Sequence, residues 1–182
     1  RSVNYSDLDL RHVALEAKGS VSSSVIDVAV AHAAWVMPHE AFVLDHLAGA
    51  FTHTKERTTL AGFSLRTPMS AIDGSAALEH VDAFSVRTMN DLRNGECTLT
   101  ITPSTIHTND LHTFLPALRF LEGEIHAAGS FSGNFENLVI HQANVSVGKS
   151  TVAFSGSITD LYKADQMRLN VITTGSIIDP AD

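Results

Sequence analysis

The side chains with the widest range of chemistry in this sequence are its ten histidines. Neutral imidazole ligates zinc and copper, and known zinc motifs place their ligands at short, fixed spacings. His39, His46 and His53 follow one another at intervals of seven residues, which aligns side chains on a helix but alternates them between the two faces of a strand. The surrounding residues alternate as in a strand, and no standard zinc-ligand spacing occurs. The sequence therefore predicts polar or solvated histidines and no metal site.

Nucleophiles and carboxylates are equally scattered. Cys97 is the one cysteine, so it can form no intrachain disulfide, and its neighbours Glu96 and Thr98 suit a structural strand residue. Neither a nucleophile elbow nor a phosphate-binding loop occurs. The aspartates stand mostly at expected turns and strand ends, where they favour turn formation over paired acid–base chemistry. We predict a protein that is not an enzyme and needs no cofactor.

Composition narrows the range of partners. Charged residues make up 18% of the chain, the net charge is −8, and no cluster of Lys or Arg occurs. Nucleic acid is not expected as a partner, because phosphate binding needs a basic patch. The longest apolar run, from Val28 to Met37, is interrupted by His32 and is too short to cross a bilayer. The sequence opens without Met or a signal-peptide pattern, and we expect an internal segment of a longer protein.

The elements that must position these side chains are strands. Apolar and polar residues alternate along most of the chain, as at Ile26, Val28 and Val30, and each such run presents one apolar face. The regular spacing of the runs predicts a mainly β protein, and Asn94-Gly95 is the strongest signal for a two-residue hairpin. Turns are predicted at Lys18-Gly19-Ser20, Met37-Pro38, Asp73-Gly74, Asn94-Gly95, Gly148-Lys149 and Thr174-Gly175.

One segment has helical spacing instead. Within residues 108–121, Leu111, Phe114, Leu115 and Leu118 share one face of a helix, and Thr108 or Asn109 can cap its start. We expect one short helix here, in one or two pieces, which packs its apolar side over the end of a sheet. It belongs to a connecting segment at 104–121.

The chain also resembles itself at an offset of 80 residues. Gly49 then aligns with Gly129 and Leu60 with Ile140, and apolar residues continue to match at alternate positions. We predict an internal repeat over approximately 41–85 and 121–165, within a single β-repeat segment that covers 1–182. Repeats of this kind stack into an elongated sheet rather than a closed globule.

The apolar strand face is the candidate functional surface. Its expected members are Phe51, Phe63, Leu65, Ile72, Leu78, Phe131, Phe135, Ile140, Val145, Val152, Phe154 and Ile158. Alternation alone favours an ordinary sandwich core over an open groove for acyl chains. Glycines in or beside the strands favour turns and bulges, and they would also let a long sheet curl around its apolar face: Gly49, Gly62, Gly129, Gly133, Gly148 and Gly156.

Several short motifs occur in a fixed order along the chain. Residues 5–8 read YSDL and 42–44 read FVL, before a strand at 60–70 that reads LAGFSLRTPMS. A helix motif at 109–118, NDLHTFLPAL, and a strand motif at 129–133, GSFSG, follow. This order resembles the repeating part of AsmA/TamB-like envelope proteins of Gram-negative bacteria, in particular the Bacteroidota-type members.

The resemblance implies an elongated, curled antiparallel sheet whose apolar groove projects into the periplasm. It implies anchoring in the inner membrane through a region outside this segment. It further implies phospholipid or another acyl-chain ligand, or an outer-membrane β-barrel protein, as the partner, and a role in lipid transport between membranes or in outer-membrane protein assembly. The family offers no catalytic residues to carry over.

Two other hypotheses stay open. A passive β-rich spacer, or a surface module that binds glycan or protein, would have a sealed core and an exposed aromatic platform. Trp35 is the one tryptophan, and the two tyrosines, Tyr5 and Tyr162, stand far apart in sequence, which disfavours such a platform. An enzyme would need His and Asp side chains that converge only in the fold.

Overall fold

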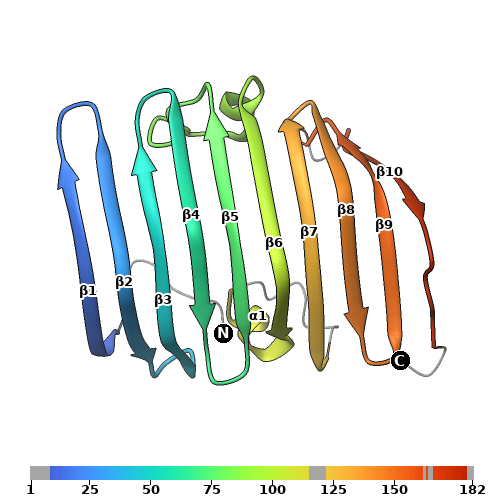
Figure 1. Ribbon diagram of the computed structural model, residues 1–182, viewed down its shortest axis with the longest axis horizontal. Coiled ribbons are helices and arrows are strands. Elements are labelled where there is room, and N and C mark those ends of the chain that lie inside the picture. The colour runs from blue at the N-terminus through green and yellow to red at the C-terminus, as the bar shows by residue number, and fades with distance from the viewer. Residues whose placement is uncertain (1–8, 115–121, 162, 164–165, 180–182) are drawn as a thin grey trace.

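The computed structural model describes residues 9–114, 122–161, 163 and 166–179. They form one ten-stranded antiparallel sheet in which the strands follow one another in chain order (Figure 1). The mainly β fold is confirmed. The strands are β1 (Arg11–Val21), β2 (Ile26–Met37), β3 (Phe42–His53), β4 (Arg57–Arg66), β5 (Ala71–Glu79), β6 (Glu96–His107), β7 (Glu124–Asn134), β8 (Asn137–Val147), β9 (Ser150–Thr159) and β10 (Arg168–Thr173).

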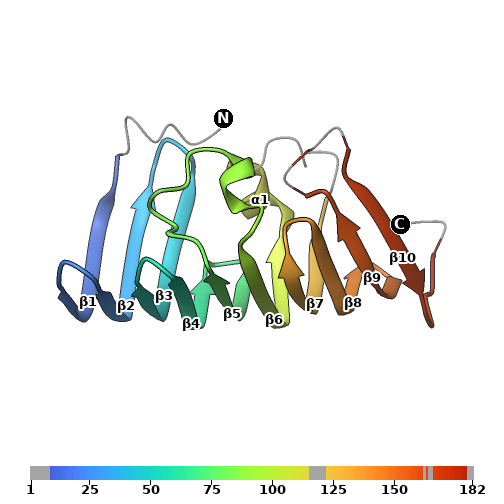
Figure 2. The ribbon, with the colours of Figure 1, turned by 90° about the horizontal axis from the view of Figure 1, so that it is seen from above.

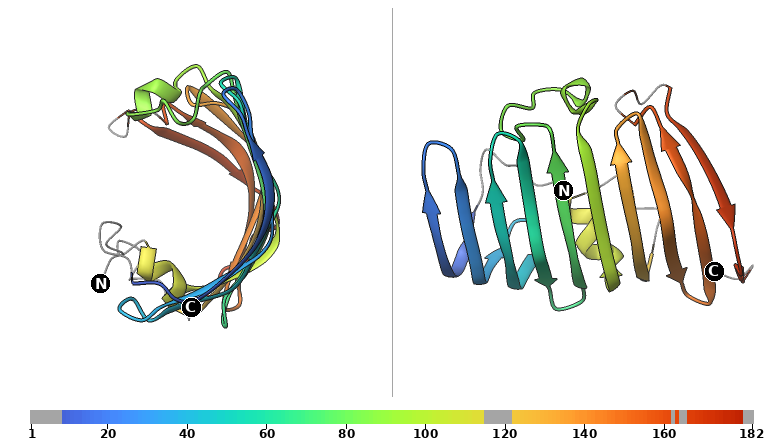
Figure 3. Two further views of the ribbon diagram at one scale, coloured as in Figure 1. Left: turned by 90° about the vertical axis from the view of Figure 1, so that its left-hand side faces the viewer. Right: turned by 45° about the horizontal axis from the view of Figure 1, so that its top comes forward.

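The sheet is a single layer that is curled but not closed. Seen along its long axis, the strands bend into a C (Figure 3), so that one face is concave and the other convex. No second sheet covers either face in the described ranges, so the sandwich-core interpretation is wrong there and the curled-sheet prediction is confirmed.

Register shifts explain much of the curl. Every neighbouring pair of strands except β9–β10 contains at least one β-bulge or similar irregularity. A bulge inserts an extra residue on one strand, which bends that strand and increases its twist. With shifts repeated from strand to strand, the bends add up to a curved surface.

Glycines inside the strands permit close approach between neighbouring backbones. A Cβ at Gly74 in β5 would overlap the carbonyl oxygen of Thr100 in β6, and one at Gly156 in β9 would overlap that of Asn170 in β10. The turns predicted at Gly19 and Gly74 are therefore wrong, because both glycines lie within strands. Glycine is common in turns, but here it lies inside strands because any side chain at these positions would clash with the neighbouring strand.

Other turn predictions differ in outcome. β2 ends at Met37, β8 at Val147 and β10 at Thr173, in agreement with the turns predicted there. The Asn94-Gly95 hairpin is wrong. β5 ends at Glu79, and residues 80–95 form a long connection to β6 that contains the 3₁₀ helix η1 (Met89–Leu92).

Two connecting segments fold over the rims of the sheet on its concave side (Figure 2). One is 80–95. The other contains the predicted helix, α1 (Thr108–Phe114), which follows β6 directly; the prediction for 115–121 falls outside the described residues. The connection therefore begins at Thr108 and not at residue 104, because β6 continues to His107.

Helix α1 is held by a chain of hydrogen bonds to the β4–β5 turn. The Asp110 carboxylate accepts from the Thr67 hydroxyl at 2.6 Å and from the Ser70 hydroxyl at 2.5 Å. The buried Ser70 hydroxyl in turn accepts from the backbone N–H of His107 at 2.9 Å. One carboxylate thus ties the helix to a turn some 40 residues earlier in the chain.

The predicted repeat corresponds to two three-stranded units, β3–β5 and β7–β9. Gly49 and Gly129 both lie mid-strand, in β3 and β7, and Leu60 and Ile140 lie in β4 and β8. A true repeat requires equivalent residues to occupy equivalent strands, and these four residues do. The repeat itself stays a prediction.

Replacing Gly74 by Ala should lower the free energy of unfolding by about 1–3 kcal/mol, because the new methyl group forces β5 and β6 apart. Chemical denaturation monitored by far-UV circular dichroism measures the loss. Ser75→Ala, at the exposed next position of the same strand, should change stability little. Equal effects of the two substitutions would contradict the close-approach argument.

Replacing Asp110 by Ala should lower the free energy of unfolding by about 1–3 kcal/mol, because the hydroxyl groups of Thr67 and Ser70 lose their acceptor. Hydrogen exchange should show faster exchange in α1 and in the 67–70 turn together. Asn109→Ala, an exposed neighbour in the same helix, is the matched control. Loss of protection in α1 alone would show that the helix and turn are not coupled.

Candidate functional site

The ladder register arranges concave-face residues into rows that cross the sheet. One row, here called the apolar row, contains no polar side chain at any strand. Its members are Gly19, Val28, Phe51, Leu60, Ala76, Leu99, Phe131, Ile140, Gly156 and Val171. Such a continuous apolar surface is the main candidate for a binding site.

The rows on either side of the apolar row are also mostly apolar. The one beside the long connection contains Val21, Ile26, His53, Thr58, Leu78, Cys97, Gly133, Leu138, Ile158 and Leu169. The one on the other side contains Ala17, Val30, Gly49, Phe63, Gly74, Ile101, Gly129, Ala143, Phe154 and Thr173. None of these three rows contains Asp, Glu, Lys or Arg.

Phe84 identifies this face as the concave one. It belongs to the 80–95 connection, which folds over the concave side (Figure 2). Its ring lies 6.4 Å from that of Phe51 and 4.3 Å from that of His53, measured between centroids. Phe51 and the residues in register with it therefore point into the curl.

The concave face is only partly shielded from water. Leu99, in the middle of the sheet, is 39% exposed, and most other members of the apolar row are half-buried. Full burial occurs locally, at Leu138 and Ile140 of β8 and in a cluster of Met37, Phe42 and Leu44 at one rim. Half-exposed apolar side chains in contiguous rows leave a surface that a further apolar molecule could cover.

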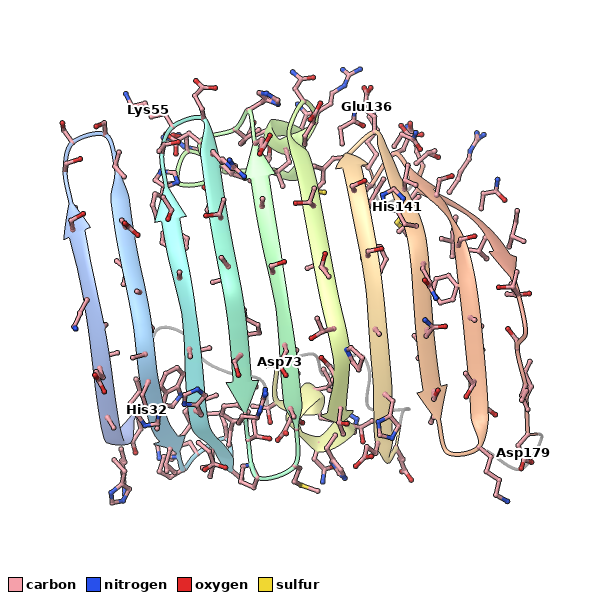
Figure 4. The ribbon with its side chains drawn as sticks, viewed as in Figure 1. His32, Lys55, Asp73, Glu136, His141 and Asp179 are labelled. Atoms are coloured by element: carbon pink, nitrogen blue, oxygen red, sulfur yellow. The ribbon has the colours of Figure 1, made fainter. Side chains whose placement is uncertain are left out.

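The convex face has the opposite composition. One of its rows contains mainly small and polar residues: Ser20, Asp27, Thr52, Thr59, Ala77, Thr98, Ser132, Val139, Ser157 and Asn170. The view in Figure 4 is onto this face, where Asp73 and His141 are labelled. The Arg66 guanidinium binds Asp73 through two hydrogen bonds and holds the pKa of that carboxyl below its ordinary value. The charged pair of Arg66 and Asp73 thus lies on the convex side, away from the three concave rows.

Most of the predicted groove residues lie together on the concave face. Phe51, Phe63, Leu78, Phe131, Ile140, Phe154 and Ile158 belong to the three rows above, and Leu65, Ile72, Val145 and Val152 extend the same face toward the α1 rim. Phe135 is the exception. It lies in the β7–β8 turn, where its carbonyl oxygen accepts from the Leu161 N–H at 2.9 Å.

Several concave residues escaped prediction. Val28, Leu60, Leu99, Ile101 and Leu138 occupy the same rows. Following the alternation along every strand would have found them. Phe84 had no such signal, since it lies in a connection without periodicity.

His53 is the titratable group most enclosed on this face. It is 7% exposed; its Nδ1 lies 2.8 Å from the Thr58 hydroxyl and its Nε2 lies 3.4 Å from the Asp82 carboxylate. The Ser85 hydroxyl and the Phe84 N–H also donate to Asp82, and these bonds lower the pKa of Asp82, that from Ser85 most. The cluster anchors the 80–95 connection over β3.

The other chemical groups remain dispersed. Within the described ranges, no three His, Cys, Asp or Glu side chains lie close enough to hold a metal ion. His39 lies in the β2–β3 turn, whereas His46 and His53 lie in β3, so the seven-residue spacing brings no site together. No helix among the described residues is both long and apolar enough to span a membrane.

Comparison with known proteins found no matching family model, curated protein or solved structure.

Cys97 should alkylate slowly at neutral pH. It projects from β6 onto the concave face, half-buried, and burial raises the pKa of its thiol, so less thiolate is present. Its rate constant with iodoacetamide should keep rising at pH values where an exposed thiol has levelled off. The matched control is Thr98→Cys in a Cys97→Ser background, on the convex face of the same strand. Equal rates for the two thiols would contradict the assigned orientation of β6.

Proposed function

We propose that this chain is a lipid-conducting segment of an envelope biogenesis protein. In this proposal it lies in the periplasm of a Gram-negative bacterium and is anchored to the inner membrane through a region outside the segment. Its concave face shields the acyl chains of phospholipids that move between the membranes. The observation that carries the proposal is the apolar row, which crosses all ten strands without a polar side chain.

The length of this surface favours a conduit over a pocket for one molecule. Ten strands at about 4.8 Å spacing extend about 43 Å across the sheet. One leaflet of a bilayer contributes about 15 Å of hydrocarbon, half of a core of about 30 Å. The concave face is therefore longer than one extended acyl chain, which suits a lipid that slides along it.

The charge pattern favours recognition of the chains rather than of the headgroup. The three central concave rows contain no Lys or Arg that could hold a phosphate, and the net charge is −8. Because the sheet is open on one side, a polar headgroup can stay in water while its chains lie against Phe51, Leu99 and Phe131. Such binding depends on apolar contact and tolerates different headgroups.

The strand edges support a second activity, in outer-membrane protein assembly. In the described part of the chain β1 pairs only with β2, and every residue of β1 is exposed, including Leu15 at 69%. An unpaired strand edge can accept a further antiparallel strand, such as one from an unfolded β-barrel client. This activity would use the backbone of the edge rather than the side chains of the concave face.

Replacing Leu99 by Asp should weaken binding of a phospholipid with a fluorescent acyl chain at least about tenfold, or about 1.4 kcal/mol, because the new carboxylate loses hydration when a chain covers it. Fluorescence titration measures the affinity. Thr100→Asp places the same charge on the convex face, where Thr100 pairs with Ser75 and Ser130, and should bind lipid as the unaltered chain does.

A second readout needs no added charge. Lipid should protect the thiol of Cys97 from alkylation and leave the Thr98→Cys control thiol reactive. No lipid binding by the unaltered chain would reject the proposal and favour the passive spacer or surface-binding module. Equal loss in the Leu99→Asp and Thr100→Asp variants would place the lipid elsewhere than on the concave face.

A further inference from the structure

We propose that copies of this chain join end to end, with strand β10 of one copy pairing with strand β1 of the next. The two strands form the edges of the described sheet, and every residue of each strand is exposed. An unpaired edge accepts a further strand through its backbone N–H and C=O groups. The partner of each edge in this proposal is the opposite edge of a second copy, and the pairing does not depend on the proposed lipid function.

The exposed side chains at both edges suit a partner strand better than water. Most of the large apolar side chains that are exposed in the described ranges lie in or beside β1 and β10: Leu10, Val13, Leu15, Val21, Val25, Met167, Leu169, Val171, Ile172, Ile177 and Ile178. Soluble proteins usually protect a free edge with charged residues or proline. Strand β10 contains no proline and one charged residue, Arg168. Edges this apolar favour a surface that another strand covers.

The number of strands makes the two edges complementary in direction. Neighbouring strands run antiparallel in chain order, and because ten is an even number, β10 runs opposite to β1. A second copy in the same orientation, placed beside β10, therefore presents an antiparallel β1, as a further strand of the sheet would. Such head-to-tail pairing covers both edges, whereas pairing of two like edges would leave the other edge of each copy exposed.

The backbone hydrogen-bonding groups of the two edges are also in phase. Along an antiparallel strand, residues alternate between those that bond one neighbouring strand and those that bond the other. The Ser22 N–H donates across the β1–β2 turn at 2.8 Å, so Gly19, three residues earlier, directs its groups away from β2. The Thr174 N–H donates to a β9 carbonyl at 2.9 Å, so Val171 likewise directs its groups away from β9. Val171 of one copy and Gly19 of the next can therefore exchange two hydrogen bonds.

This register continues the concave rows from one copy into the next. Val171 and Gly19 are the two ends of the apolar row. Placing them opposite each other aligns the ends of the two flanking rows as well, Leu169 with Val21 and Thr173 with Ala17. Leu169 and Val21 are 61% and 75% exposed in the single chain, and they would cover each other at the junction. Burial of these apolar side chains favours the association.

The convex side of the junction brings no like charges together. The opposed pairs there are Asn170 with Ser20, Ile172 with Lys18 and Thr174 with Glu16. Each pair contains at most one charge, so the pairing avoids the like-charge repulsion that destabilises cross-strand neighbours. The aliphatic stem of Lys18 can also cover Ile172, which is 66% exposed, while its ammonium group stays in water.

Sedimentation velocity of the whole chain tests the association. The chain should form oligomers whose average mass rises with protein concentration, because head-to-tail contacts of this kind do not close. Val171→Pro should weaken the association at least about tenfold, since proline lacks the N–H that donates to Gly19. That N–H points away from β9, so the substitution leaves the β9–β10 ladder intact.

Val171→Thr is the matched control, because it keeps both the N–H and the shape of the side chain. It should associate as the unaltered chain does. A chain that stays monomeric at every concentration would overturn the proposal, as would equal association of the Val171→Pro and Val171→Thr variants.

Disulfide formation tests the register in chains that carry Cys97→Ser. Chains with Asn170→Cys are mixed with ¹⁵N-labelled chains with Ser20→Cys, and oxidation should yield mainly the mixed dimer. The two residues form a non-hydrogen-bonded pair in the proposed register, with Cα atoms about 4.5 Å apart, which suits a disulfide. Lys18→Cys in place of Ser20→Cys is the control, since it lies diagonal to Asn170 at about 7–8 Å.

The masses of the products distinguish the possible arrangements. Dimers between two Asn170→Cys chains or two Ser20→Cys chains, in place of the mixed dimer, would indicate pairing of like edges and overturn the head-to-tail arrangement. Equal yields of mixed dimer with Lys18→Cys and with Ser20→Cys would overturn the register.

Discussion

The constraint on which this structure depends is the phase of side-chain alternation across ten strands. A strand turns successive side chains to opposite faces, so a bulge, which adds one residue, would move the rest of that strand's apolar residues to the wrong face. The sequence compensates with odd spacings. Leu60 and Phe63 of β4, and Ile140 and Ala143 of β8, are three residues apart, yet each pair stays concave because a bulge lies between its members.

This arrangement explains how a single-layer sheet retains an apolar face without a second layer to bury it. Curvature draws the concave side chains toward one another, so they are half-buried by their own neighbours. The rim segments cover further surface at two places, through Phe84 over Phe51 and through the Asp110 contacts of α1. The remaining exposure, as at Leu99, leaves part of the apolar face accessible to a further molecule.

The sequence predicted the strands, the helix and most of the concave face because all three are encoded as local periodicity. It could not distinguish groove from core, since both require the same alternation and differ only in whether a second layer exists. The turn prediction at Gly74 is wrong because glycine is needed there for close approach to Thr100 on the neighbouring strand. Local sequence does not reveal such a contact between strands. Asn94-Gly95 has the composition of a hairpin turn, but the fold uses it to end a long connection held by His53 and Asp82. Phe135 fits the apolar composition of the face, yet no periodicity reveals that it lies in a turn.

The same bulges that preserve the concave face also determine what the convex face can do. The register of β2 and β3 shifts between Val30 and Ala33, the interval that contains His32. Without that shift, residues 30 and 32 of β2 would share one face, and His32 would point into the apolar curl beside Val30. The added residue turns its imidazole outward to meet His46. One local irregularity therefore bends the sheet and keeps a polar ring out of the proposed lipid surface. It also creates the histidine pair. The backbone geometry of β2 thus determines the composition of both faces at this point.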